Sequence, residues 1–131
     1  MIRFKITDPV LKTEPLFILN CSYNELRHYL IKNFNCDVSE ESDNGGEVLG
    51  KMITYSVDPR RVVYIRDFNF KTEDWGIVAH EIFHLVTRIC QDKGIPIVSH
   101  INPRECGDEA AAYLYEFFFN EFMNKMKKIK K

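Results

Sequence analysis

The stretch 72–94 constrains the fold most strongly, because it has the pattern of a single amphipathic helix. Its apolar residues recur at the spacing of one helical face, at Val78, Ile82, Leu85 and Ile89. Thr72 can cap the start of this helix, and Gly94 with Pro96 marks its end. We therefore expect a helix that buries one apolar stripe in the core.

The same helix carries the pattern H-E-x-x-H, formed by His80, Glu81 and His84. Residues four apart share one face of an α-helix, so both imidazoles can reach one metal ion. Zinc takes nitrogen ligands at about 2.0–2.1 Å, and in catalytic sites it keeps one position for water. Glu81 lies about 100° further round the helix, where its carboxylate can act on that water as a general base. The alternative is a surface-facing histidine pair beside an ordinary glutamate.

A catalytic zinc site needs a third protein ligand, and the sequence offers several after the motif helix. The metzincin continuation is absent, since Thr87 stands where its glycine would be. Glu109 is the preferred candidate, because the three alanines that follow it let the last helix pack closely on the motif helix. The other residues that stay open as ligands are Glu105, Asp108, Glu116 and His100.

Further roles are open to four polar residues in or near the last helix, namely Tyr113, His100, Asp108 and Glu105. Tyr113, one turn after Glu109, could donate a hydrogen bond to an oxyanion, although a tyrosine there is more often a core residue. His100 lies between the two helices and could play the same part, with a solvated loop histidine as the alternative. Asp108 could accept a hydrogen bond from a ligating histidine or cap the last helix. Glu105 could instead belong to a capping box.

The rest of the chain predicts short strands and two further helices. Ser22 and Glu25 form a capping box for an amphipathic helix over residues 22–33. Residues 51–57 and 61–68 are rich in β-branched and aromatic side chains and flank an Asp-Pro turn, which predicts a hairpin.

Residues 1–6 alternate like a further strand, and the last helix should begin between residues 102 and 108. Tyr113, Phe117 and Phe118 are its core candidates. We therefore expect one α+β domain over residues 1–131, in which a helix, the motif helix and the C-terminal helix pack on a small, mainly antiparallel sheet.

The composition limits the partners of this chain. Its formal net charge is −1, which gives no overall attraction to nucleic acid or anionic membranes. No apolar run reaches the roughly 20 residues that cross a bilayer, and the first residues lack a signal-peptide pattern. The four cysteines are widely spaced, which favours free buried thiols over disulfides or a cysteine zinc site. We expect a cytoplasmic protein without nucleic-acid or membrane partners.

The stretch "VAHEIFHLV" and the later "DEAAAYLYEFF" together resemble the small zincin-like metallopeptidases encoded by phages and prophages. Those proteins pair a helical H-E-x-x-H with a later helix of the form E-A-x-A-Y-L, and the resemblance covers residues 74–119. It implies a minimal zincin-like fold of the gluzincin type and Zn²⁺ as cofactor. It also implies that His80, His84 and Glu109 are the ligands and Glu81 the base. A weaker similarity runs to the ImmA/IrrE-type peptidases, although no helix-turn-helix companion is apparent here.

Two functions of different classes follow from these patterns. The first is a zinc-dependent hydrolase, a metallopeptidase that uses Glu81 to activate a zinc-bound water against a peptide or protein substrate. If zincin geometry holds, residues 62–66 would be the edge strand that pairs with an extended peptide. The second is a metal-stabilised, non-catalytic accessory protein of a phage or mobile element. The presence of Glu81 favours the first, because a purely structural site needs no base.

Overall fold

The computed structural model describes residues 1–38, 49–55, 61–95 and 108–130 of the chain. These residues form an α+β structure, as predicted. Its strands are β1 (Ile2–Lys5), β2 (Leu16–Leu19), β3 (Gly50–Thr54) and β4 (Arg61–Ile65), and its helices are α1 (Tyr23–Phe34), α2 (Thr72–Asp92) and α3 (Asp108–Lys130). None of these helices is long and apolar enough to cross a membrane.

The strands form one mixed sheet in the order β1-β2-β4-β3. Strand β1 pairs with β2 and β3 pairs with β4 in antiparallel fashion, whereas β2 and β4 run parallel. The predicted hairpin is therefore present, although its turn lies outside the described residues. The expectation that residues 62–66 form an edge strand is wrong, because β4 is paired on both sides. Among the described strands, β3 is the outermost on that side of the sheet.

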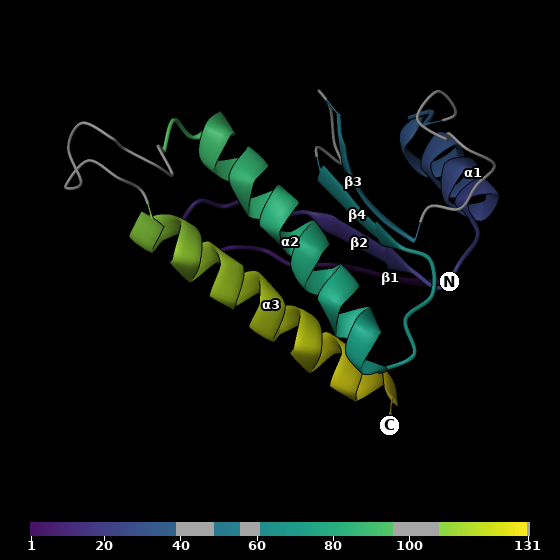
Figure 1. Ribbon diagram of the computed structural model, residues 1–131. Helices are drawn as coiled ribbons and strands as arrows, with labels where there is room; N and C mark the ends of the chain where they lie inside the picture. Colours follow the sequence, from purple (N-terminus) through teal and green to yellow (C-terminus); the bar gives the residue numbers. More distant parts are fainter. Residues whose placement is uncertain (39–48, 56–60, 96–107, 131) are drawn as a thin grey trace.

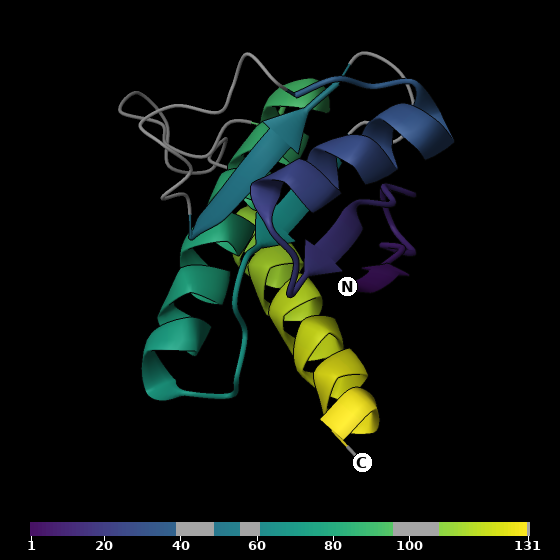
Figure 2. The same cartoon turned by 90° about the vertical axis from the view of Figure 1, so that its right-hand side faces the viewer.

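Helices cover both faces of the sheet, as Figures 1 and 2 show. Helices α2 and α3 lie side by side on one face, and α1 covers the other. Alternate residues of each strand face opposite ways. Phe17, Leu19, Val63 and Ile65 therefore join the core under α2 and α3. Leu16, Ile18, Val62 and Tyr64 join the separate core under α1. Because both faces are covered, β2 and β4 are buried along their whole length.

Short sequence signals set the ends of the helices. Ser22 and Glu25 form the predicted capping box of α1, with the Ser22 oxygen accepting from the Glu25 N–H at 3.1 Å. The expectation that Thr72 caps α2 is wrong, since Thr72 is its first helical residue. The Asp74 carboxylate instead accepts the backbone N–H groups of Asn69 at 2.7 Å and Lys71 at 3.1 Å. Thr72 is already inside the helix, so an acidic side chain of the first turn accepts the N–H groups that lie just before the helix.

Helix α2 ends as predicted at a glycine in the left-handed conformation. Gly94 has a φ of +67° and donates to the Gln91 carbonyl at 3.2 Å. Ile95 donates to the Cys90 carbonyl at 2.8 Å, which completes a Schellman motif. These two hydrogen bonds define the end of the motif helix.

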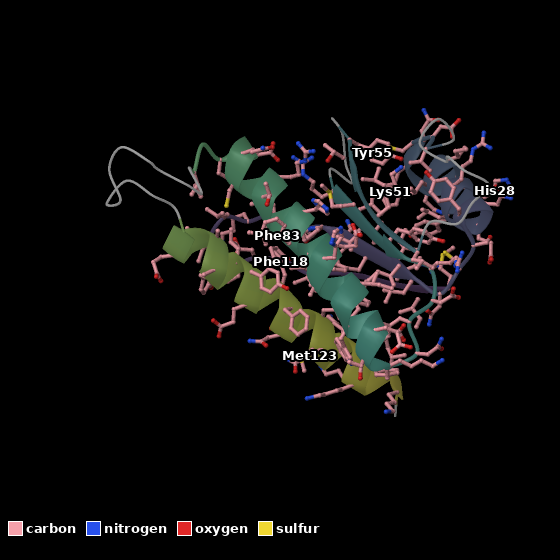
Figure 3. All side chains as sticks on the ribbon, in the orientation of Figure 1. His28, Lys51, Tyr55, Phe83, Phe118 and Met123 are labelled. Carbon is pink, nitrogen blue, oxygen red and sulfur yellow. The ribbon has the colours of Figure 1, made fainter. Side chains whose placement is uncertain are left out.

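The predicted apolar stripe of α2 is fully buried in the core. Val78, Ile82, Leu85 and Ile89 are each at most 1% exposed. On α3, Phe118 is buried between the two helices (Figure 3), and Phe117 is partly buried. The expectation that Tyr113 belongs to the core is wrong, because its side chain is 46% exposed. Helix α3 meets α2 along the row that contains Leu114, Phe118 and Phe122, and Tyr113 lies outside that row.

Candidate functional site

Helix α2 holds the two histidines of the motif side by side on its exposed face. The Nε2 atoms of His80 and His84 are 3.1 Å apart, and their rings meet edge to face at 79° with centroids 4.7 Å apart. The opposite face of the helix is anchored by its buried stripe, so this orientation follows from the packing of α2 on the sheet. The two nitrogens are within hydrogen-bond distance of each other, so one imidazole can donate to the other.

The spacing of the two nitrogens fits a shared metal ion. Two ligands about 2.05 Å from a tetrahedral zinc ion lie about 3.3 Å apart, close to the observed 3.1 Å. Imidazole nitrogen is also a donor that zinc prefers. His80 and His84 therefore suit two positions of such a site, and the histidine pair needs at least one further ligand to hold zinc firmly.

Glu81 projects from α2 toward the sheet instead of toward solvent. It is only 6% exposed, and its carboxylate accepts no hydrogen bond from the described residues, although its oxygens are not fully shut off from solvent. Burial raises the pKa of the Glu81 carboxyl above its ordinary value, and the neighbouring His80 and His84 oppose that rise. A buried carboxylate without a donor is costly to keep charged. It is therefore well suited to accept a proton.

Gly50 of strand β3 makes room for the Glu81 side chain. A Cβ atom at position 50 would lie 2.9 Å from Ile77 Cγ2 and 3.2 Å from both Cγ and Oε2 of Glu81. Only a glycine lets the strand pass this close to the helix. Sequence reasoning did not single out Gly50, and the available signal was the glycine at the start of a β-branched strand.

A surface cavity of about 330 Å³ connects these groups. It lies between the edge strand β3 and helix α2. Its lining residues are Gly50, Lys51, Met52, His80, Glu81, His84 and Arg88. The catalytic candidates of α2 thus share one cavity with β3, the outermost described strand on this side of the sheet. Arg88, which continues the row of the two histidines by one more turn, was not predicted.

A second, apolar cavity of about 200 Å³ lies on the other side of the histidines, between α2 and α3. Phe83, Thr87, Ala112 and Tyr115 are among its lining residues. Phe83 is 60% exposed at its rim, and its ring lies 6.2 Å from that of His84. Ala111 and Ala112 line this cavity, so the alanines leave a hollow between α2 and α3 at this point.

The third ligand is not brought to the histidines within the described part of the chain. No group of three or more His, Cys, Asp or Glu side chains there could hold a metal ion. Glu109 lies exposed in the first turn of α3, and Glu116 and Tyr113 are exposed further along the same helix. His100 and Glu105 lie outside the described residues, as does the side chain of Asp108. His28 is exposed on α1, on the far face of the sheet (Figure 3).

The structure therefore brings together His80, Glu81 and His84, and leaves Glu109 and Tyr113 apart from them. Ala112, one turn after Glu109, lines the apolar cavity next to Phe83. Because residues three apart share a helix face, Glu109 lies on the side of α3 nearest that cavity. Comparison of the chain with protein-family models, with curated proteins and with solved structures finds no match.

Proposed function

We propose that this protein is a zinc-dependent hydrolase, a metallopeptidase whose general base is Glu81. The single observation that carries the proposal is the buried Glu81 carboxylate beside two histidine nitrogens 3.1 Å apart. A helix that needed only a stable core would gain nothing from an unpaired carboxylate at such a position. The resemblance of residues 74–119 to small phage and prophage metallopeptidases points the same way.

His80 and His84 would hold the metal. Glu109, which the structure leaves apart from the two histidines, stays our proposed third ligand, with Glu105 and His100 outside the described residues as the alternatives. When bound, zinc supplies a Lewis acid that polarises a carbonyl and lowers the pKa of water toward about 7. Glu81 accepts a proton from the attacking water and returns it to the leaving amine. Burial assists both transfers, because a raised carboxyl pKa brings the proton affinity of Glu81 closer to those of the attacking water and the leaving amine.

The substrate would reach the site along β3. This strand is at the edge of the sheet, and residues 50–52 line the cavity that contains Glu81. An extended peptide can add to such an edge by main-chain hydrogen bonds, which fixes its backbone beside the motif. The three described cysteines are buried and form no disulfide with one another, which accords with a reducing compartment such as the cytoplasm.

A non-catalytic, metal-stabilised accessory protein is the second candidate. The exposure of both His80 and His84 favours it, because a surface site can bind a metal without enclosing a substrate. The two candidates differ in what Glu81 does. A binding module needs no proton acceptor beside the metal.

Hydrolysis of a peptide library by zinc-loaded protein, read by mass spectrometry, separates the two candidates. We expect wild type to cleave and Glu81→Gln to bind zinc normally but lose cleavage by at least about 100-fold. Glu73→Gln is the matched control, because Glu73 is an exposed glutamate in the first turn of the same helix. Equal cleavage by wild type and Glu81→Gln would refute the catalytic role. Normal zinc binding without cleavage by wild type would favour the accessory protein.

A further inference from the structure

The cavity that contains Glu81 has an unusual charge for this protein. Its ionisable lining residues are Lys51, His80, Glu81, His84 and Arg88. Among the residues that the structure describes, Glu81 is the one carboxylate that lines this cavity. Its described lining thus carries two cations, Lys51 and Arg88, and one carboxylate, whereas the chain as a whole has a formal net charge of −1. Such a cavity attracts anionic groups.

Arg88 is the cation that can make direct contact inside this cavity. It follows His80 and His84 at a spacing of four residues, so all three side chains lie in one row along α2. Its Nη1 donates to Gln91 Oε1 at 3.2 Å, which orients the guanidinium along the helix surface. The remaining donors of the planar guanidinium suit a carboxylate.

Lys51 lines the same cavity, but its side chain belongs to the other face of the sheet. Neighbouring residues of a strand point to opposite faces. Met52 packs against the core under α2, and Ile53 is buried in the core under α1. The alternation places the Lys51 side chain with Ile53, and Figure 3 shows Lys51 on the side of α1. Lys51 can add to the local potential without contacting a group in the cavity.

We infer that the cavity selects substrates by a carboxylate, which Arg88 binds next to the cleaved bond. This inference rests on the proposed metallopeptidase function and names its substrate class. The carboxylate has two sources, an aspartate or glutamate side chain or the free C-terminus of the peptide. Both present the same two oxygens to the guanidinium.

The helix geometry limits how far this carboxylate lies from the cleaved bond. Arg88 is six residues past the midpoint of His80 and His84, which corresponds to about 9 Å along the helix axis. An extended peptide advances about 3.4 Å per residue. The carboxylate therefore belongs within about three residues of the bond that is cleaved.

Binding of two matched hydroxamates to zinc-loaded protein tests the inference without turnover. The probes are suberic acid monohydroxamate and its neutral amide, which share the zinc-binding group, differ in one carboxylate and can span the roughly 9 Å to Arg88. Calorimetry at pH 7.5 and low salt should give about tenfold tighter binding of the acid, since hydrogen bonds between charged groups contribute this much. The preference should shrink as salt is raised.

Two variants locate the preference. Arg88→Gln should reduce the ratio of the two affinities to less than about threefold. Lys51→Gln removes the same charge from the same cavity lining and should leave most of the ratio intact. A ratio that survives in Arg88→Gln would overturn the assignment to Arg88. Equal binding of the two probes to wild type would overturn the carboxylate inference and leave the metal site standing.

The failure of the underlying function has a different signature. If neither hydroxamate binds zinc-loaded protein, the metal centre itself is wrong and the inference falls with it.

If the acid probe does bind more tightly, peptides separate the two carboxylate sources in the zinc-loaded Glu81→Gln variant. An amidated peptide with an internal glutamate and a free-acid peptide with glutamine are compared with an amidated glutamine peptide. Tighter binding of one of the first two identifies the source, and equal binding of all three contradicts the inference.

Discussion

Replacement of Gly50 by alanine tests the close approach of β3 to the motif helix. The new Cβ would lie 2.9 Å from Ile77 Cγ2, nearer than real Cβ atoms approach other atoms, and 3.2 Å from Glu81 Cγ and Oε2. Overpacking of this kind costs about 1–3 kcal/mol. Alanine also restricts the unfolded chain more than glycine does, which offsets about 0.4–1 kcal/mol of this cost. We therefore expect Gly50→Ala to lower the free energy of unfolding by roughly 1–2 kcal/mol.

Urea denaturation followed by circular dichroism and by the fluorescence of Trp75, the sole tryptophan, measures this change. Gly76→Ala is the matched control, because a Cβ at this helical position meets nothing within 4 Å. It should stabilise the protein by up to about 1 kcal/mol, since alanine is the better helix former. The two glycine substitutions thus have opposite predicted signs.

A second substitution identifies the atom responsible. Ile77→Ala removes the Cγ2 atom, so Gly50→Ala should cost at least about 0.5 kcal/mol less in that background than in wild type. The same stability for Gly50→Ala and wild type would refute the reasoning. An undiminished cost in the Ile77→Ala background would show that the strain does not come from this contact.

Two further predictions concern stability away from the site. Burial, assisted by the charge of Glu25, raises the pKa of the Cys21 thiol to about 11 from 9.0. The folded protein then holds this proton more tightly than the unfolded chain, so its stabilising effect is complete below pH 9 and is lost toward pH 11. The free energy of unfolding should fall by roughly 2 kcal/mol more between pH 8 and 10.5 in wild type than in Cys21→Ala; an equal fall in both would contradict the assignment. Arg61 is 7% exposed and pairs with Asp92 at the end of α2. Arg61→Ala should cost about 3 kcal/mol in urea denaturation, against less than about 1 kcal/mol for Arg66→Ala, which breaks a pair with a 62% exposed aspartate. Similar costs for the two variants would show that burial does not govern these pairs.

Local patterns predicted the elements whose signals lie within one segment of the chain. The capping box at Ser22, the stripe of α2 and the glycine that ends it are each decided by near neighbours, and all three are present. Strand β2 was missed, because its four residues are buried on both faces and so show no alternation. Its parallel pairing with β4 joins segments more than forty residues apart. No local signal records such a pairing, and the same pairing is what moves β4 to the interior of the sheet.

The same distinction, between geometry within one segment and contacts between distant segments, applies to the candidate site. His80, Glu81 and His84 could be predicted because one helix fixes their mutual geometry. The roles of Gly50 and Arg88 depend on how β3 lies against α2, which the helix alone does not determine. The position of Glu109 depends on how α3 packs on α2. The alanines after Glu109 do not determine how its carboxylate lies relative to the histidines.

Zinc content tests the central claim most directly. Protein purified without an affinity tag, supplied with zinc and then dialysed, is measured by elemental analysis for wild type, His80→Ala and Glu109→Ala. His28→Ala is the control, since His28 is exposed on the far face of the sheet. We predict about one zinc per chain in wild type and His28→Ala, and a loss in both other variants. Zinc that survives Glu109→Ala would assign the third ligand to another residue. The absence of zinc from wild type would contradict the metal centre and the hydrolase with it.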